Sequence, residues 1–260
     1  MKKIIFLIFL FIVSICHSKN EVALKIEPND SLKVIKKMTK NYEDGVFQNE
    51  ELIVFTYEDN LISKISTTQN GNFLEEVGVK YENGKLKQMN LLYTTLRNSK
   101  NNLINPPKEN LNVIYNYNDD DLITSLNKES NGLKYIHSFT YNDAKQLIKE
   151  VESKDGIMLR EKKYSYDKNG NISKEKNIAE GEYEYYKSYD DKNNPFSLIY
   201  PDAYLKIYNI SKNNIKSYSM SNNSYTYEYE YNSNNYPTKI IRKKGRKIES
   251  ETIIEYSTIQ

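Results

Sequence analysis

The sequence predicts an all-β protein: an antiparallel meander of about eight repeated β-hairpins that form a curved sheet or an open, shell-like barrel. Three observations predict it. Tyrosines followed by a polar turn and an aliphatic residue recur along the chain. An apolar residue usually stands two positions before each of these tyrosines, and a second turn signal with glycine lies between one tyrosine and the next. No stretch shows a convincing helical period.

The chain begins with a segment typical of a secretory signal peptide. Residues 1–18 place Lys2 and Lys3 before an apolar run from Ile4 to Cys16. A run of about 13 apolar residues suits a signal peptide. It is too short for a membrane span, which needs roughly 20. We therefore expect an exported protein.

Two processing routes stay open at the end of this leader. Cleavage after Ser18 would release residues 19–260 without a lipid. Lipidation would instead make Cys16 the first mature residue, because Val13-Ser14-Ile15-Cys16 resembles a bacterial lipoprotein signal, although Ile15 stands where Gly, Ala or Ser is usual. The expected location is secreted, periplasmic or an outer-membrane lipoprotein of a bacterium. If the protein is attached to a membrane, we expect the attachment to be a lipid on Cys16.

The mature chain is expected to carry no net charge. The whole sequence has 37 Lys and Arg against 35 Asp and Glu, a net charge of +2. The two surplus bases are Lys2 and Lys3, which leave with the leader. A neutral chain lacks the basic field that non-specific nucleic-acid binding needs, so we expect no nucleic-acid partner.

The repeat is marked by tyrosines roughly 24 residues apart, with one longer interval. Alternation with period two places each anchor tyrosine on the same strand face as the residue two positions earlier. The Asn or Asp that usually follows favours a turn, because its side chain can cap nearby backbone N–H groups. The anchors are Tyr57, Tyr81, Tyr117, Tyr141, Tyr166, Tyr189, Tyr208, Tyr231 and Tyr256.

Between successive anchors lies a turn signal that contains glycine. Asn-Gly and Asp-Gly are favoured in tight hairpins, where both central residues need positive φ. Each unit is therefore a strand, a glycine turn, a second strand and a tyrosine turn. The glycine turns are Asp44-Gly45, Asn70-Gly71, Asn131-Gly132, Asp155-Gly156 and, more weakly, Glu180-Gly181 and Lys244-Gly245.

One insertion interrupts the repeat. Residues 97–112 account for the longest interval, and Pro106-Pro107 favours a loop there. Pro195 and Pro201 are also expected outside central ladder positions, because proline cannot donate a ladder hydrogen bond. No linker is visible, so residues 19–260 are expected to form a single domain.

The repeat resembles the tyrosine-aspartate (YD) repeats of the Rhs family. Tyr166-Asp167-Lys168-Asn169-Gly170-Asn171-Ile172 nearly matches the consensus Tyr-Asp-x-x-Gly-Asn-Leu, whereas the other units are degenerate. The resemblance implies consecutive β-hairpins that build long curved sheets, and in large members a shell around a toxin. The leader and short chain are more similar to small secreted or lipoprotein relatives, for which the resemblance implies no particular activity.

The sequence offers few residues for catalysis or metal binding. Cys16 is the only cysteine and His137 is the only histidine after the leader, which excludes zinc sites built from His and Cys from the mature chain. We expect His137 to pack beside Phe139. The loop from Asp167 resembles the start of a calcium loop but has Ile178 at the position of the last acid ligand. We predict no catalytic residue, no metal site and no cofactor.

The candidate binding residues are four alternating tyrosines, Tyr225, Tyr227, Tyr229 and Tyr231. If their shared face is exposed, it is a flat platform for stacking on sugar rings or on a partner's apolar surface. The anchors of the other units lie on the same face, which favours the core or the inner face of the sheet.

These observations favour a non-catalytic secreted or cell-envelope repeat protein, a binding or scaffold module for a glycan or an envelope protein. Two alternatives stay open. One is a secreted, carboxylate-dependent, glycan-active enzyme, because 35 acidic residues allow many carboxylate pairs. The other is a shell or carrier for a toxin peptide.

Overall fold

The structure is a computed structural model of the chain, and it describes residues 32–93, 109–130, 132–178 and 180–258. The predicted signal peptide, residues 1–18, lies outside the described residues, as does the lipidation candidate Cys16.

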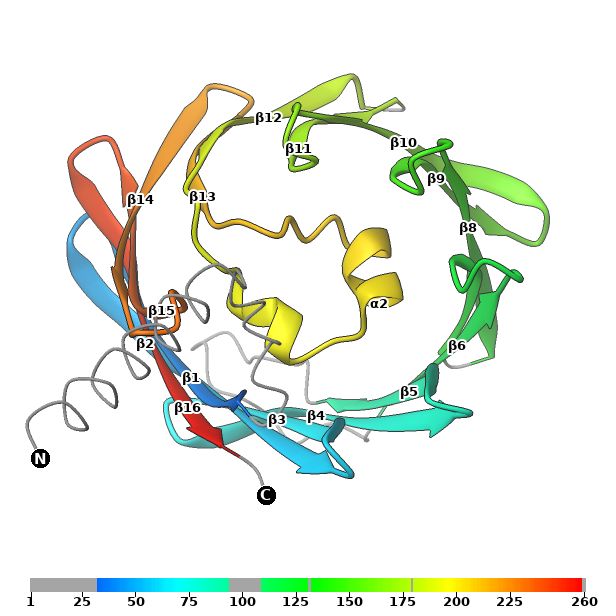
Figure 1. Cartoon of the computed structure of the whole chain (residues 1–260), viewed down its shortest axis with the longest axis horizontal. Coiled ribbons are helices and arrows are strands. Elements are labelled where there is room, and N and C mark those ends of the chain that lie inside the picture. Colours follow the sequence, from blue (N-terminus) through cyan, green and yellow to red (C-terminus); the bar gives the residue numbers. More distant parts are fainter. Residues whose placement is uncertain (1–31, 94–108, 131, 179, 259–260) are drawn as a thin grey trace, which may run out of the picture.

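Sixteen antiparallel strands follow one another along the chain and close into a barrel (Figure 1). They are β1 (Leu32–Glu43), β2 (Val46–Glu58), β3 (Leu61–Gln69), β4 (Asn72–Glu82), β5 (Lys85–Tyr93), β6 (Glu109–Tyr117), β7 (Ile123–Ser130), β8 (Leu133–Tyr141), β9 (Leu147–Lys154), β10 (Ile157–Tyr166), β11 (Ile172–Asn177), β12 (Glu182–Tyr189), β13 (Ile215–Met220), β14 (Asn223–Tyr231), β15 (Pro237–Lys244) and β16 (Lys247–Thr258).

The predicted all-β antiparallel meander is confirmed, and the sheet closes completely. β16 pairs back with β1 from Leu32 opposite Thr258 to Asn41 opposite Ser250. Each strand pairs with both of its neighbours. The barrel therefore contains more hairpins than the number, about eight, that the repeat predicts. Closure removes the unpaired edges that an open sheet would expose.

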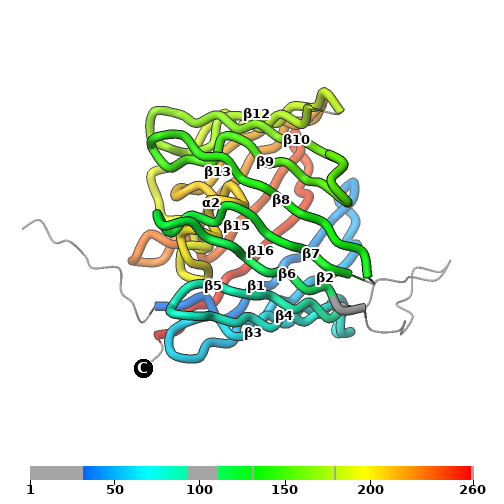
Figure 2. Tube along the Cα trace, turned by 90° about the vertical axis from the view of Figure 1, so that its right-hand side faces the viewer, coloured from blue at the N-terminus to red at the C-terminus, as the bar shows by residue number. Residues whose placement is uncertain are grey.

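Eight of the nine predicted anchor tyrosines lie in the last three residues of the even-numbered strands. Antiparallel strands alternate in direction, so these tyrosines gather at one end of the barrel, which we call the anchor rim. In side view, β1 begins and β16 ends at this rim (Figure 2). The repeat in sequence is therefore a ring in space.

Six of the eight anchor hydroxyls at this rim bridge the two strands of their own unit. Each donates to the backbone carbonyl oxygen of a residue at or near the start of the preceding odd-numbered strand. We call this set the tyrosine ladder: Tyr57 to Val34 (2.7 Å), Tyr117 to Leu86 (2.8 Å), Tyr141 to Ile123 (2.6 Å), Tyr166 to Leu147 (2.8 Å), Tyr189 to Ile172 (2.7 Å) and Tyr256 to Pro237 (2.6 Å).

The Asn or Asp after the anchor closes its own turn. The Asp167 carboxylate accepts hydrogen bonds from the backbone N–H groups of Asn169 (2.8 Å) and Asn171 (2.9 Å). The Asn232 side chain does the same two and four residues further on. The tyrosine thus bridges the two strands of its unit, and the acidic or amide residue shapes the turn into the next unit.

The glycine turns close the opposite end of the hairpins. Asp44 and Gly45 have φ of 51° and 83°, and Asp155 and Gly156 have φ of 51° and 79°. Two successive positive φ angles are the geometry expected for these dipeptides in a tight hairpin.

Tyr208 was wrongly assigned as an anchor. Residues 190–214 do not form a hairpin but run inside the barrel as a segment that we call the plug (Figure 1). The plug contains the 3₁₀ helix η1 (Pro195–Leu198) and the helix α2 (Asp202–Ile207). Among the described residues, no helix is long and apolar enough to cross a membrane.

The segment predicted as an insertion, residues 97–112, is only partly loop. Residues 97–108 lie outside the described residues, but β6 already begins at Glu109. Leu111 pairs with Leu91 of β5. The strand therefore starts inside the predicted insertion, because Leu111 continues the inward alternation of Val113 and Tyr115.

Removing one ladder hydroxyl is expected to destabilise the barrel without disturbing ring packing. Tyr141→Phe and Tyr166→Phe each delete one hydrogen bond to a carbonyl, and we expect each to lower the free energy of unfolding by about 1 kcal/mol in urea denaturation. Tyr185→Phe is the control, because Tyr185 lies on the outer wall and is 45% exposed. A loss of similar size in the control would contradict a special role for the ladder.

The ladder is also expected to limit stability at high pH. Burial, with the nearby charge of Asp121, raises the pKa of Tyr117 from 10.0 to about 12, and burial raises the pKa of Tyr166 to about 12. Above pH 10 the unfolded chain loses protons that the folded chain keeps, so stability is full below that pH and falls towards pH 12. An absorbance titration of phenolate, followed with circular dichroism, should show these tyrosines ionising as the barrel unfolds. Complete ionisation near pH 10 with the β-signal intact would contradict this.

Candidate functional site

The interior of the barrel is not filled by the strands alone. A barrel of 16 to 18 strands encloses more space than its wall side chains occupy. Here the plug fills part of that space, towards the anchor rim (Figure 2). The neck of the plug is held by Asp190 and Asn214, whose backbone N–H···O bond is 3.0 Å and whose side chains bond at 3.0 Å.

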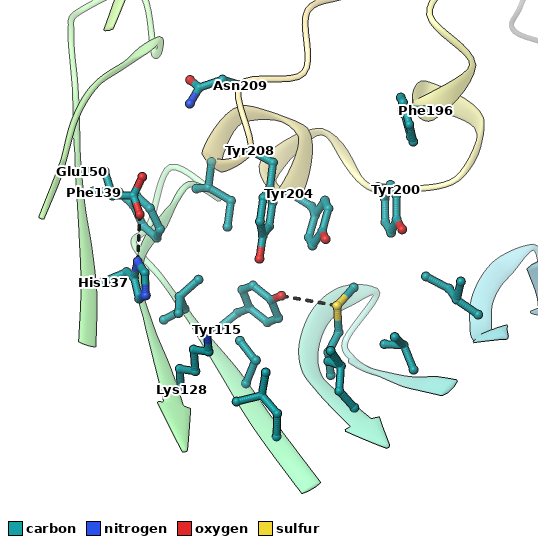
Figure 3. A pocket seen from close by; sticks show the side chains of 18 of the residues that line it. Tyr115, Lys128, His137, Phe139, Glu150, Phe196, Tyr200, Tyr204, Tyr208 and Asn209 are labelled. Carbon is teal, nitrogen blue, oxygen red and sulfur yellow. Dashed lines mark hydrogen bonds and ion pairs between the residues drawn. The ribbon is translucent and has the colours of Figure 1, made fainter. Parts of the chain in front are cut away.

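The plug presents a row of aromatic rings to the interior. Phe196, Tyr200, Tyr204 and Tyr208 are spaced four residues apart, and the ring centroids of both adjacent tyrosine pairs are 4.4 Å apart. Figure 3 shows these rings side by side, with the hydroxyls of Tyr204 and Tyr208 directed towards Tyr115. Because the rings stack on one another, their faces are covered. The ring edges that carry the hydroxyl groups point into the space between the plug and the barrel wall.

A cavity of about 530 Å³ lies between the plug and the barrel wall, and we call it the lumen cavity. Its size lies within the roughly 300–1,000 Å³ typical of small-molecule sites. One side is mainly apolar and comes from inward residues of β2 to β7: Phe55, Ile65, Val77, Met89, Val113 and Leu126. Thr67 and Glu75 also line this side, and the Thr67 hydroxyl donates to the Glu75 carboxylate at 3.3 Å.

The other side of the cavity is ionic and comes from β8 to β11. His137 Nδ1 lies 2.8 Å from a Glu150 carboxylate oxygen (Figure 3), and the Tyr164 hydroxyl donates to the other oxygen at 2.8 Å. Burial by itself would raise the pKa of Glu150. The hydrogen bonds from His137 and Tyr164 and the nearby Lys162 charge outweigh it and hold that pKa below its ordinary value of 4.5.

The remaining acids of this side are also paired with bases. Lys162 forms an ion pair with Glu175, and Arg160 lies 2.9 Å from Glu152. The Arg160 Nε is buried and has no hydrogen-bond partner within the described part of the chain. The three carboxylates Glu150, Glu152 and Glu175 thus each face a positive or protonatable group.

The predicted binding tyrosines Tyr225, Tyr227, Tyr229 and Tyr231 face the interior, not the outer surface. Tyr225 is buried beneath the Arg242 guanidinium, 4.4 Å from its ring centroid. The Tyr229 hydroxyl donates to the Ile215 carbonyl at 2.6 Å, and Tyr231 bonds Asp190 in the plug neck. These rings support the wall and the plug and are not among the residues that line the lumen cavity.

The other residues considered for catalysis or metal binding are His137 and Asp167. His137, expected beside Phe139, lines the lumen cavity. The Asp167 carboxylate caps its own turn. Across the residues that the structure describes, no group of three or more His, Cys, Asp or Glu is placed to hold a metal ion.

The outer wall carries both charged and apolar side chains. Cross-strand ion pairs join Lys36 to Glu255 (3.0 Å), Lys64 to Glu76 (3.7 Å) and Lys239 to Glu230 (3.7 Å). Exposed apolar side chains on the strands include Val54, Ile136 and Ile253.

Comparison with known proteins supports the fold. No protein-family model matches the chain, and no curated protein matches it in sequence. A porin-like protein from Bacteroides uniformis has a similar fold, with a TM-score of 0.53 and 13% identity over 87% of this chain and 96% of that chain. A TcdB2-TccC3 chain aligns with a TM-score of 0.25 and 11% identity, over 85% of this chain and 16% of its own length. The first likeness shows the fold alone, and the second carries no argument.

The ionic side of the cavity is expected to make the barrel sensitive to acid. Since the folded-state pKa of Glu150 is depressed, its stabilisation is present above about pH 4.5 and is lost as the pH falls through the lower folded value. Glu150→Gln should therefore flatten the fall in urea midpoint between about pH 6 and about pH 3. Glu129→Gln, on the outer wall, is the control. An unchanged acid profile in Glu150→Gln would contradict this assignment.

Proposed function

We propose that this protein is a non-catalytic binding module whose ligand occupies the lumen cavity. One observation carries the proposal: the plug fills only part of the closed barrel and leaves a cavity of about 530 Å³. Its lining is largely aliphatic and aromatic with a few polar groups, the usual composition of a small-molecule site.

The pairing of the acids favours binding over catalysis. Glycan hydrolysis uses two carboxylates on either side of the scissile bond, one as acid and one as base or nucleophile. Here Glu150 is engaged by His137 and Tyr164, Glu175 by Lys162, and Glu152 by Arg160. These contacts support an ionic network that holds the wall together.

The ligand is a small molecule or the end of a glycan chain. The interior already holds the protein's own segment, residues 190–214, which argues against a shell around a toxin peptide. The four tyrosines Tyr225, Tyr227, Tyr229 and Tyr231 point inward, which argues against a stacking platform on the outer surface.

The proposed setting is the bacterial cell envelope or the secreted fraction. The signal-peptide pattern of residues 1–18 supports it, with Cys16 as the candidate lipid anchor. We also infer that the repeat is of the tyrosine-aspartate type. The tyrosine ladder and the capped turns give both residues of the Tyr-Asp pair a structural role.

Filling the cavity should abolish binding while the barrel stays folded. Val113→Trp places a large side chain inside the lumen cavity, and Ile114→Trp places the same side chain on the outer wall. We expect the fluorescent dye anilinonaphthalene sulfonate to bind the wild-type barrel, and its affinity to fall at least about tenfold in Val113→Trp but not in Ile114→Trp.

Circular dichroism and urea denaturation check that both variants fold, because overpacking costs about 1–3 kcal/mol. Equal dye binding by wild type, Val113→Trp and Ile114→Trp would place the dye outside the lumen and contradict the proposed function.

A further inference from the structure

The lumen cavity has two chemically different sides, which constrains what it can bind. On the apolar side, Phe55, Ile65, Val77, Met89 and Val113 are each 5–8% exposed and contribute no polar side-chain group. On the opposite side, His137, Glu150 and the neighbouring ion pairs face the same space. A ligand that matches both sides has an apolar body and a polar end.

Lys128 stands at the boundary between these sides. It projects inward from β7, with Val113 opposite on β6 and Tyr135 opposite on β8. Figure 3 shows its side chain in the cavity beside Tyr115. The neighbouring acid on the same strand, Glu129, faces outward and pairs with Lys134 at 3.9 Å.

Lys128 forms no ion pair among the residues that the structure describes. Two other cavity bases form ion pairs, Lys162 with Glu175 and Arg160 with Glu152. Burial lowers the pKa of Lys37, and the nearby negative charge of Glu51 partly offsets that effect. A cation against an apolar wall is costly without a counter-charge. An anionic group on a ligand would supply it.

Tyr208 adds a neutral hydroxyl to the same cavity. This hydroxyl hydrogen-bonds with those of Tyr115 and Tyr204, while Tyr115 donates its own proton to Met89 Sδ at 3.4 Å. The side chain is 49% exposed although it lies within the barrel, so the surrounding space is accessible.

We propose that the ligand is an amphipathic carboxylate, such as a fatty acid. Its apolar chain lies along Phe55, Val77 and Met89, and its carboxylate is held by the Lys128 ammonium. This inference rests on the proposed function, since it names the ligand class of the same cavity. It requires no reaction.

The test compares two probes with alkyl chains of similar length, one ending in a carboxylate and the other in a neutral hydroxyl. Laurate and dodecanol, below their aggregation concentrations, are titrated against the folded barrel by displacement of anilinonaphthalene sulfonate. We expect laurate to bind at least about tenfold more tightly than dodecanol, and each methylene removed from the acid to weaken binding about threefold to fourfold.

Three lysine variants locate the head group. Lys128→Gln should weaken laurate about tenfold and leave dodecanol unchanged, because only the acid uses the charge. Lys128→Arg keeps the charge and should retain the preference for the acid, which also guards against a variant that fails to fold. Lys134→Gln, on the outer wall of the next strand, should change neither probe.

The outcomes separate this inference from the proposed function. Equal binding of laurate and dodecanol, or loss of the preference in Lys37→Gln instead of Lys128→Gln, would overturn the inference. If Val113→Trp still abolished dye binding in that case, the lumen would remain the binding site. If Val113→Trp affected neither dye nor laurate, the proposed function itself would fail.

Discussion

The hydrogen bond from an anchor tyrosine to a carbonyl at the start of the preceding strand is the contact on which the barrel depends. It links residues 17 to 31 positions apart and recurs at the anchor rim from Tyr57 to Tyr256. A strand that slipped by one residue would turn its tyrosine outward, so the bond also fixes register. Successive hairpins therefore stack with similar offsets, and strand twist carries the sheet round until β16 meets β1.

The ladder changes beside the plug. At β14 the bond to the preceding strand is made by Tyr229, which reaches the Ile215 carbonyl, while Tyr231 bonds Asp190 in the plug neck. The row of alternating tyrosines in β14 thus has two structural roles: Tyr229 holds the preceding strand, and Tyr231 holds the plug. The position of the plug then determines where space is left in the lumen.

Most of the fold could be predicted because its signals are local. The Tyr-Asp turn at Tyr166 and the glycine turn at Asp155 each act within a few residues, and their recurrence reveals the repeat. The plug was missed because Tyr208 imitates an anchor, being followed by Asn209 and later by Ile215. Its four-residue spacing from Tyr204 and Tyr200 is the helical signal. The lumen cavity could not be predicted, because Lys128, His137 and the plug rings meet only after the barrel closes.

The likeness to a porin-like protein concerns the fold, and one fold can carry many functions. The function therefore has to be inferred from the site. Cross-strand ion pairs such as Lys36–Glu255 face outward here beside exposed apolar side chains such as Ile136, and the buried apolar residues face the lumen. The partly plugged interior, with one mainly apolar side and one ionic side, holds the most distinctive chemistry of this barrel. Within that interior Glu150, Glu152 and Glu175 are paired with neighbouring bases, and Glu75 accepts a hydrogen bond from Thr67. The Lys128 ammonium has no ion-pair partner among the described residues. The unmatched charge therefore points to a ligand more directly than the more numerous matched ones do.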